Sequence, residues 1–281
     1  MALRLEPFGA LAYHLVNRKL TFLKRPELVS VIRGLQRHDN VRSALVEAGI
    51  PETQWPAYES ALRHLAAADM VRPSCREGWF TVTLPAGRPA GGRLVEQFEY
   101  GLDAPICLTW ELTYACNLAC AHCLSSSGRR DPRELTTAQC EAVIDELQRM
   151  QVFYINVGGG EPTIRDDFWH LLEYAVDSSF HLAAFGEKLP RLNLCGAGRV
   201  VCLIDPVGDV YACPFAIHDS FLAGNVLADG GFQRVWRTSV LFKGLRSPQT
   251  SGACTGCQFF DSCRGGCMAA KFFTGSPGGR A

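Results

Sequence analysis

Three cysteines, Cys116, Cys120 and Cys123, stand at the spacing C-x3-C-x2-C directly after an apolar, strand-like segment. Three thiolates this close together in the sequence can bind one metal cluster. A 4Fe-4S cluster normally takes four thiolates, so three of them leave one iron with an open coordination position. Because an open position on a bound metal is typical of catalytic rather than structural sites, the spacing predicts a catalytic iron–sulfur centre.

The segments on either side of these cysteines predict the elements that position them. Residues 106–112 read as a strand that leads into the cysteine loop. Thr136 is a candidate N-cap for a helix over 136–150, whose apolar residues recur at helical spacing. Residues 152–157 form a second apolar strand, which ends in the sequence GGGEP at 158–162. Glycines let the backbone approach a ligand closely, although a glycine run after a strand is by itself more often only a turn.

A second group of cysteines lies in the last third of the chain. Within it, residues 200–204 and 209–212 predict a β-hairpin whose turn spans 205–208. The last four cysteines have the spacing C-x2-C-x5-C-x3-C, which also suits tetrahedral zinc, so zinc is the simpler alternative to iron for them. The group consists of Cys195, Cys202, Cys213, Cys254, Cys257, Cys263 and Cys267.

The composition excludes several classes of partner. The chain has 28 basic and 28 acidic residues and a formal net charge of zero, which argues against a nucleic acid or an anionic membrane held by bulk charge. No segment approaches the ~18 apolar residues of a membrane-spanning helix. The charged, proline-interrupted start predicts no signal peptide, and an odd total of 13 cysteines favours free thiols over disulfides. We therefore expect a cytoplasmic protein.

Residues 1–85 are predicted to form a separate small domain of the winged-helix type. Segments 10–15 and 20–23 flank residues 17–19 and read as a hairpin, and residues 79–84 predict a last strand. A generic small domain is the simplest interpretation of this unit. Three helices are expected between the hairpin and the last strand, from apolar residues on shared faces: Leu28, Ile32 and Leu35; Val41 and Leu45; and Trp55, Tyr58, Leu62 and Leu65.

The cysteine loop, followed one helix and one strand later by the glycine run, resembles the radical SAM family. The resemblance implies that Cys116, Cys120 and Cys123 hold a 4Fe-4S cluster whose open iron binds the amino and carboxylate groups of S-adenosylmethionine (SAM). That cluster, supplied with an electron by a separate electron donor, reduces SAM to a 5′-deoxyadenosyl radical. The family's GGEP motif, which holds the methionine ammonium of SAM, corresponds to Gly159, Gly160, Glu161 and Pro162.

The C-terminal cysteines resemble the SPASM domain, which carries auxiliary 4Fe-4S clusters in radical SAM enzymes that act on ribosomally made peptides. By that family's pairing, the chain has the ligands of one complete auxiliary cluster and three ligands of a second. Together with the cysteine loop upstream, this resemblance favours iron–sulfur clusters over zinc. The first set of ligands is Cys195, Cys202, Cys213 and Cys267, and the second is Cys254, Cys257 and Cys263.

Both ends of the chain resemble proteins of mycofactocin biosynthesis. Segments 6–14 and 22–26 are similar to the mycofactocin peptide chaperone, and four later segments are similar to the mycofactocin radical SAM maturase. The resemblance implies SAM-dependent oxidative decarboxylation of the C-terminal tyrosine of a ribosomally made precursor peptide, followed by a crosslink to the adjacent valine. In such maturases the leader of the precursor adds as a strand to the sheet of the recognition domain. The later segments are 97–112, 193–199, 213–218 and 263–271.

The predicted architecture is α/β and α+β, with a winged-helix recognition domain at 1–85, a linker at 86–107, a partial radical SAM β/α barrel at 108–179 and a SPASM domain at 180–281. A six-unit partial barrel would need about 190 residues, scaled from the roughly 250 of an eight-unit barrel. The 72 residues of the third segment accommodate two β/α units. The barrel is therefore expected to be internally shortened and to lack strands three to six.

Two hypotheses follow from the shortened barrel. The first is a radical SAM peptide maturase. The second is a non-catalytic iron–sulfur or peptide-binding protein, derived from such an enzyme by internal deletion. The family resemblance favours the first hypothesis, whereas the missing strands favour the second.

Overall fold

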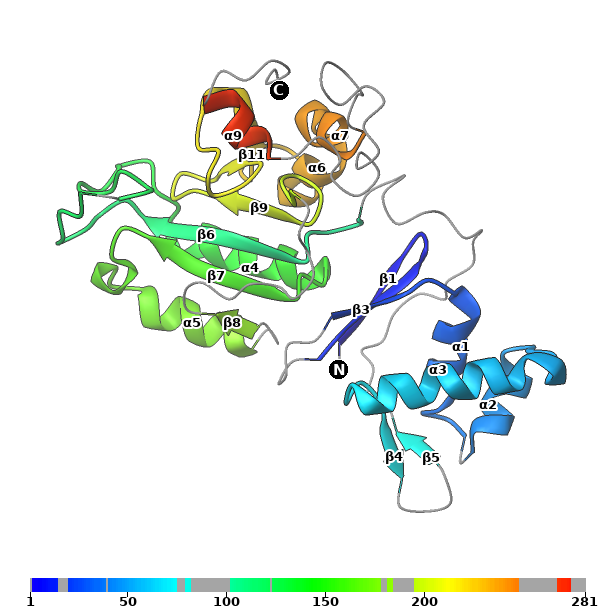
Figure 1. The fold of residues 1–281 in the computed structure, drawn as a ribbon. Coiled ribbons are helices and arrows are strands. Elements are labelled where there is room, and N and C mark those ends of the chain that lie inside the picture. Colours follow the sequence, from blue (N-terminus) through cyan, green and yellow to red (C-terminus); the bar gives the residue numbers. More distant parts are fainter. Residues whose placement is uncertain are drawn as a thin grey trace. The chain divides into compact units, whose positions relative to one another are not determined.

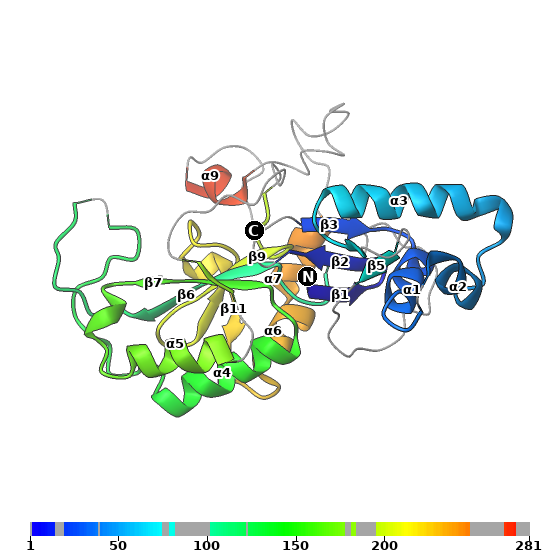
Figure 2. The same cartoon turned by 90° about the horizontal axis from the view of Figure 1, so that it is seen from below.

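The computed structural model divides the chain into two compact units, Met1–Tyr100 and Gly101–Ala281, which appear in two views in Figures 1 and 2. The structure describes residues 2–14, 20–38, 40–74, 79–81, 102–121, 123–177, 181–183, 195–247 and 267–273.

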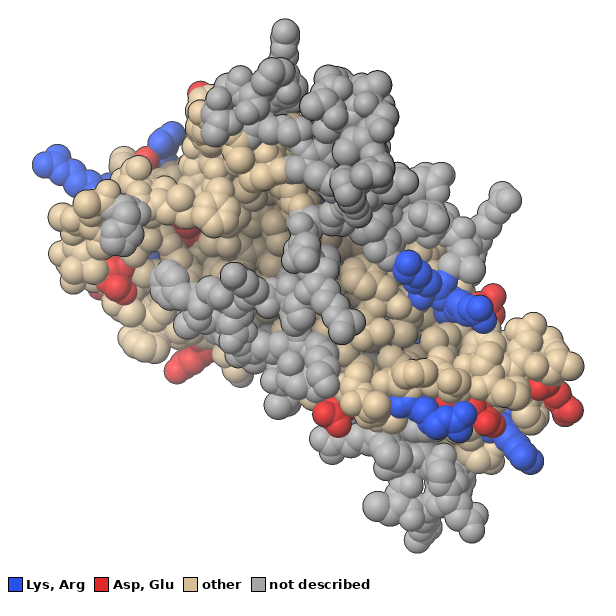
Figure 3. Space-filling view, in the orientation of Figure 1, with Lys and Arg blue, Asp and Glu red and all other residues tan. Residues whose placement is uncertain are grey.

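The surface of the described residues carries mixed charge. On the face shown in Figure 3, acidic and basic side chains are interspersed, in keeping with the zero net charge of the sequence. Among the described helices, none combines the length and the apolar character needed to cross a membrane.

The first unit combines a three-stranded antiparallel sheet, three helices and a separate hairpin. The hairpin at 10–23 and the three helices are confirmed, and the last strand is found at Trp79–Thr81, paired with Arg72–Ser74. The strand at Ala2–Glu6 was not predicted. The elements of the first unit are β1 (Ala2–Glu6), β2 (Gly9–Tyr13), β3 (Leu20–Leu23), α1 (Pro26–Gly34), α2 (Val41–Glu47), η1 (Glu52–Gln54), α3 (Trp55–Ala67), β4 (Arg72–Ser74) and β5 (Trp79–Thr81).

The second unit is built around a six-stranded open sheet with the order β11-β10-β9-β6-β7-β8. The central pairs β6–β7, β7–β8 and β6–β9 are parallel, whereas β9–β10 and β10–β11 are antiparallel. The hairpin predicted at 200–212 is therefore present, and its first strand joins β6 directly. The strands are β6 (Cys107–Thr113), β7 (Tyr154–Gly159), β8 (His181–Ala183), β9 (Val201–Ile204), β10 (Asp209–Tyr211) and β11 (Leu222–Asn225).

One prediction about this sheet is wrong. A third parallel strand, His181–Ala183, follows the second helix and pairs with β7, although strands three to six were all expected to be missing. The strand is only three residues long, so it is too short to show the alternating pattern by which strands are recognised in a sequence. The sheet contains three consecutive parallel strands of the barrel type and is not closed.

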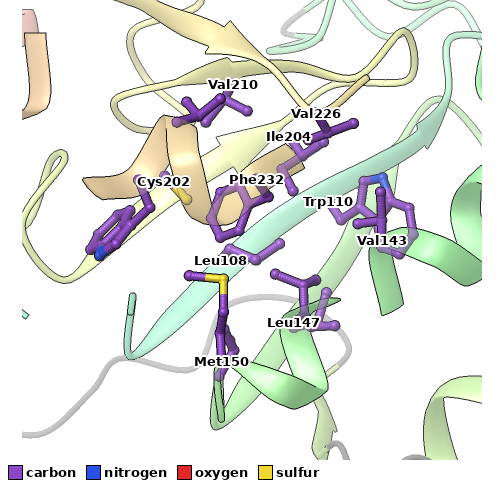
Figure 4. Close-up of a cluster of buried hydrophobic side chains, with 14 of the residues drawn as sticks. Leu108, Trp110, Val143, Leu147, Met150, Cys202, Ile204, Val210, Val226 and Phe232 are labelled. Carbon is purple, nitrogen blue, oxygen red and sulfur yellow. The ribbon is translucent and has the colours of Figure 1, made fainter. Parts of the chain in front are cut away.

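Helices cover one face of this sheet. Figure 2 shows α4, α5 and α6 on the same side of β6 and β7. Because side chains alternate along a strand, Leu108 and Trp110 of β6 point to this side and pack with Val143, Leu147 and Phe232 (Figure 4). The helices and short turns of the unit are α4 (Thr137–Arg149), η2 (Pro162–Ile164), α5 (Phe168–Asp177), η3 (Asp219–Phe221), α6 (Gly231–Thr238), α7 (Val240–Arg246) and α9 (Met268–Phe273).

Capping interactions define where α4 and α6 begin. Thr136 and Gln139 form a capping box at the start of α4, as the sequence predicted for Thr136. The carboxylate of Glu146, on α4, accepts hydrogen bonds from the backbone N–H groups of Phe232 (2.9 Å) and Gln233 (2.8 Å). A carboxylate at a helix N-terminus satisfies free N–H groups there, so α4 directly fixes the position of α6.

Candidate functional site

The cysteine loop leaves the end of β6 and returns to it through backbone hydrogen bonds. The N–H of Cys116 donates to the Gly128 carbonyl (3.1 Å), and the N–H of Gly128 donates to the Tyr114 carbonyl (2.8 Å). Cys116 is half-buried, whereas Cys120 and Cys123 are exposed. The loop therefore presents its thiols at the C-terminal end of β6, the edge of a parallel sheet where ligands usually bind.

Two thiols of this loop accept hydrogen bonds, and those of Cys123 favour its thiolate form. The sulfur of Cys123 accepts from the N–H of Ser127 (3.4 Å) and lies 3.7 Å from the hydroxyl of Ser125. These contacts, led by the Ser127 N–H, lower the pKa of Cys123. The sulfur of Cys116 accepts from the N–H of Leu118 (3.4 Å). Thiolate is the form that binds iron, so the donor chemistry of the loop fits an iron–sulfur cluster.

The structure does not draw these sulfurs together into a finished metal site. Within the described ranges, no three Cys, His, Asp or Glu side chains are grouped closely enough to hold a metal ion. The three cysteines nevertheless share one short loop whose two ends are tied together.

A buried carboxylate anchors the base of the cysteine loop. Glu134 accepts hydrogen bonds from the hydroxyl of Thr113 (3.0 Å) and the N–H of Tyr114 (2.8 Å). It also accepts from the N–H of Asp131 (3.3 Å) and from Arg130 Nε (3.1 Å). Glu134 is 7% exposed. Glu134 was not predicted as part of the site, because its partners Thr113 and Tyr114 lie 21 and 20 residues earlier in the chain and leave no local sequence pattern.

A second contact joins the loop to the C-terminal hairpin. The phenol of Tyr114 donates to Asp205 Oδ2 at 2.7 Å. The other oxygen of Asp205 accepts from the backbone N–H groups of Val207 (3.0 Å) and Asp209 (2.8 Å). Asp205 begins the turn between β9 and β10, so the residue that precedes the cysteine loop is held by the turn of the C-terminal hairpin.

The three glycines after β7 differ in what surrounds them. A Cβ on Gly160 would overlap the carbonyl oxygen of Ala115, and a Cβ on Gly159 would lie 2.6 Å from the carbonyl oxygen of Thr113. Gly159 also has a φ of +108°, which favours glycine. A Cβ on Gly158 would meet no described atom within 4 Å. Gly159 and Gly160 therefore allow the close approach of the cysteine loop, and only Gly158 borders open space.

The turn after the glycines is tied to the start of the cysteine loop. The N–H of Gly160 donates to the Thr113 carbonyl and the N–H of Glu161 donates to the Ala115 carbonyl, both at 2.8 Å. The carboxylate of Glu161 accepts from the N–H (3.1 Å) and the hydroxyl (2.6 Å) of Thr163. These bonds lower the pKa of Glu161, so the group is an anion at neutral pH and can attract a cationic ligand. Pro162 is buried behind it.

Two of the C-terminal cysteines influence a third. Burial is the main cause that raises the pKa of Cys213 to about 11, and the nearby Cys195 and Cys267 contribute to the increase. Cys195 and Cys213 are half-buried, whereas Cys267 is exposed. Cys267 stands immediately before α9, where its sulfur accepts from the N–H of Ala270 (3.4 Å). Cys195 and Cys267, two other members of the first predicted ligand set, are therefore each near enough to Cys213 to influence its pKa.

Cys202, the fourth member of that set, lies in a different environment. It is fully buried on β9 within the hydrophobic core. Burial raises its pKa strongly, the neighbouring Cys107 adds to the effect, and Arg246 opposes it. In the pairing of β9 with β6, Cys202 stands opposite Leu108, and both side chains belong to the hydrophobic core. The other predicted ligands, Cys254, Cys257 and Cys263, lie outside the described residues.

Three family models match successive parts of the chain. Residues 1–72 match the peptide chaperone MftB family. Residues 110–194 match the radical SAM superfamily, and residues 195–258 match the SPASM iron–sulfur cluster-binding domain. The resemblances found in the sequence are confirmed, and the chain joins a chaperone domain to a radical SAM and SPASM pair.

The relatives show how the chain is shortened. It is 43% identical to mycofactocin maturase MftC of Mycolicibacterium smegmatis over 327 positions, which take in 66% of this chain and 83% of the relative. Since 66% of 281 residues is about 185, about 140 of those positions have no counterpart here. The N-terminal part is 45% identical over 78 residues to peptide chaperone MftB of the same organism, covering 28% of this chain and 76% of that protein.

A solved structure shares the fold. Streptococcus suis SuiB, crystallised with S-adenosylmethionine, aligns with a TM-score of 0.55 at 13% identity, over 96% of this chain and 95% of SuiB. At that identity the likeness shows the architecture alone. The extent and identity of the match to the mycofactocin maturases show more: the chain belongs to the mycofactocin maturase family of radical SAM enzymes, with a chaperone domain fused at its N-terminal end.

Proposed function

We propose that this chain oxidatively decarboxylates the C-terminal tyrosine of a ribosomally made precursor peptide and then crosslinks it to the adjacent valine, using SAM. One observation carries the proposal. The cysteine loop and the GGEP turn are joined by the hydrogen bonds Gly160 N–H to Thr113 and Glu161 N–H to Ala115. Residues suited to a cluster and residues suited to a methionine ammonium are thereby held side by side, at the C-terminal ends of adjacent parallel strands.

The roles of the residues in this reaction follow from their chemistry. Cys116, Cys120 and Cys123 would hold the cluster. The backbone of 159–162 and the ionised Glu161 would hold the ammonium of SAM. A 4Fe-4S cluster, when bound there, supplies the electron that cleaves SAM to an adenosyl radical, and the electron comes from a separate donor protein or reductant. Thr113, Tyr114 and Glu134 keep the loop in place.

The C-terminal cysteines would hold one or two auxiliary 4Fe-4S clusters. The neighbouring thiols of Cys195, Cys213 and Cys267 support this assignment. In the same proposal the remaining ligands are Cys202, Cys254, Cys257 and Cys263. Clusters of this kind need reduced thiols, which fits a cytoplasmic location.

The first unit would bind the leader of the precursor peptide. Its likeness to peptide chaperone MftB supports this role. In the described sheet, β2 is paired on both sides, so β1 and β3 form the edges. Residues Leu20, Thr21 and Phe22 of β3 are half-buried, so this strand keeps an accessible side on which an extended peptide can add as a further strand.

A second candidate function is a non-catalytic iron–sulfur or peptide-binding protein. The specific observation in its favour is that about 140 aligned positions of the related maturase have no counterpart in this chain. The described sheet has only three consecutive parallel strands of the barrel type, β6, β7 and β8. A shorter sheet surrounds SAM and a peptide end less completely, and exclusion of water is needed to protect a radical.

The test is a turnover assay on the full chain. Anaerobically reconstituted protein is incubated with SAM, a chemical reductant and a synthetic precursor peptide, and the products are examined by mass spectrometry. A peptide that has lost the mass of CO2 and two hydrogen atoms, together with 5′-deoxyadenosine, is the expected result. Cleavage of SAM without any change in the peptide, or peptide binding without SAM cleavage, would favour the non-catalytic alternative.

A further inference from the structure

The face of the second sheet opposite α4 is polar near the cysteine loop. Leu108, Trp110 and Leu112 of β6 belong to the hydrophobic core on the helical side, so Glu111, which alternates with them, points to the other side. In the parallel pairing of β6 with β7, Glu111 stands opposite Gly158, and Thr109 stands opposite Asn156. Glu111, Asn156 and Gly158 therefore share one face; together they are called the Glu111 site.

Two hydrogen-bond acceptors of the Glu111 site are buried and unused. Glu111 is 5% exposed, and its Oε2 atom has no hydrogen-bond partner in the described part of the chain. The same is true of Asn156 Oδ1, which is also shielded from solvent. Burying an acceptor without a partner destabilises a fold. Two such atoms on neighbouring strands indicate that a hydrogen-bond donor is supplied from outside.

There is room for a ligand beside these acceptors. Gly158 is buried, yet a Cβ placed on it would contact no described atom within 4 Å. A Cβ on the next residue, Gly159, would lie 3.1 Å from the Cβ of Glu111. The Cβ of Glu111 therefore lies next to Gly159 of the GGEP turn, and the neighbouring residue Gly158 borders open space.

The groups that face Glu111 are acidic or neutral. Burial and, to a smaller extent, the nearby Asp205 raise the pKa of Glu111 to about 7. The other titratable groups that interact with Glu111 are the phenols of Tyr114 and Tyr211. Since no cation opposes Glu111 among these neighbours, a hydrogen-bond donor, and best a positively charged one, would stabilise the carboxylate.

We propose that the Glu111 site binds a hydrogen-bond-donating group, an ammonium or an amide N–H, of a ligand held at the GGEP turn. The proposal rests on the proposed function, in which both SAM and the precursor peptide carry such groups. In this assignment Glu111 accepts the charged or stronger hydrogen bond, Asn156 accepts a second one, and Gly158 leaves the space that the ligand fills.

The first test compares the stability of ligand-free protein with and without the carboxyl. Glu111→Leu removes a buried acceptor that has no partner, and Glu111→Gln removes the buried negative charge while keeping the shape of the side chain. Both variants should therefore melt at a higher temperature than wild type at about pH 8. The folded-state pKa of Glu111 is raised from 4.5 to about 7. The stability that the protonated carboxyl contributes to the fold is therefore fully present below the unfolded-state pKa of 4.5, and it is lost as the pH rises through 7. The gain should therefore shrink toward about pH 5. A lower melting temperature for both variants at pH 8 would overturn the proposal, because it would give Glu111 a structural partner.

The second test measures ligand binding by equilibrium dialysis, with SAM alone in one arm and a synthetic precursor peptide alone in the other. Reconstituted wild-type protein is compared with Glu111→Leu and with Gly158→Ala, which fills the open space without a positive φ to strain it. Both variants should bind at least one of the two ligands about tenfold more weakly, and the affected arm identifies the source of the donor group. Wild-type protein that binds neither ligand contradicts the proposed function together with this inference. Wild-type binding that survives both substitutions contradicts this inference alone.

Discussion

The two cysteine groups of the second unit are held in opposite ways. In the loop after β6, all three thiols are exposed or half-buried, and backbone N–H groups already point at two of them. In the C-terminal group, burial raises the pKa of Cys213 to about 11, and Cys202 is enclosed in the hydrophobic core. The first group is accessible to a ligand, whereas burial in the second keeps the thiols of Cys202 and Cys213 uncharged.

This difference follows from how far apart the ligands are in the sequence. The cysteine loop depends on contacts within one loop and on Glu134 and Gly160 at its base. The C-terminal group depends on how β9, the loop after β10 and the start of α9 meet in space. A ligand set that is local in sequence is positioned by local hydrogen bonds, while a dispersed set needs the whole domain to be assembled around it.

The largest effect is expected from removal of the anchor of the cysteine loop. Glu134→Ala leaves the Thr113 hydroxyl and the Tyr114 N–H without their buried acceptor, so the free energy of unfolding of the metal-free protein should fall by about 3 kcal/mol. This change in free energy is measured by urea denaturation, from the unfolding transition that belongs to the second unit. Glu173→Ala, at an exposed position of α5, is the matched control and should change the value by less than about 0.5 kcal/mol. Equal effects of the two substitutions would show that Glu134 does not anchor the loop.

The next effect separates two glycines that the sequence presents as one motif. Gly160→Ala brings a methyl group onto the Ala115 carbonyl, so it should destabilise metal-free protein by about 2 kcal/mol. Gly158→Ala meets no described atom and should change stability by less than about 0.5 kcal/mol. Thermal unfolding of the two variants gives the comparison. If Gly158→Ala is the more damaging substitution, the assignment of the close contact to Gly160 is wrong.

A smaller effect, which involves no change in stability, compares the two cysteine groups directly. The pKa of Cys123 is lowered by the Ser127 N–H, whereas that of Cys213 is raised to about 11. Because the thiolate is the reactive form, iodoacetamide should label Cys123 at least about tenfold faster than Cys213 in reduced, metal-free protein at pH 7.5. Peptide mapping at timed intervals measures the rates, and protein unfolded in urea is the control in which the difference should disappear. Equal rates in folded protein would remove the contrast between the two groups.

The parts of the fold that were predicted from the sequence depend on short-range patterns. The apolar runs gave β6 and β7, Thr136 gave the start of α4 through its capping box, and the turn at 205–208 gave the hairpin of β9 and β10. In each case the signal lies within a few residues of the element it specifies. The cysteine loop was recognised for the same reason.

The features that the sequence did not reveal are long-range. β8 is three residues long and exists because β7 offers it an edge. The pairing of β9 with β6, about 95 residues apart, and the contact of Tyr114 with Asp205 both depend on the completed sheet. The family resemblance assigned Gly159 and Gly160 to SAM binding, whereas in the structure both glycines also allow close contact with the chain's own backbone. Spacing alone cannot separate these two reasons for a glycine.

The central claim, that the loop of Cys116, Cys120 and Cys123 holds a SAM-binding iron–sulfur cluster, is tested most directly by electron paramagnetic resonance. Anaerobically reconstituted and reduced protein should give a cluster signal that changes when SAM is added. The triple variant Cys116→Ala, Cys120→Ala, Cys123→Ala should lose the SAM-dependent change and keep the iron of the C-terminal cysteines. Protein that takes up only zinc, or a SAM-dependent signal that persists in the triple variant, would contradict the claim.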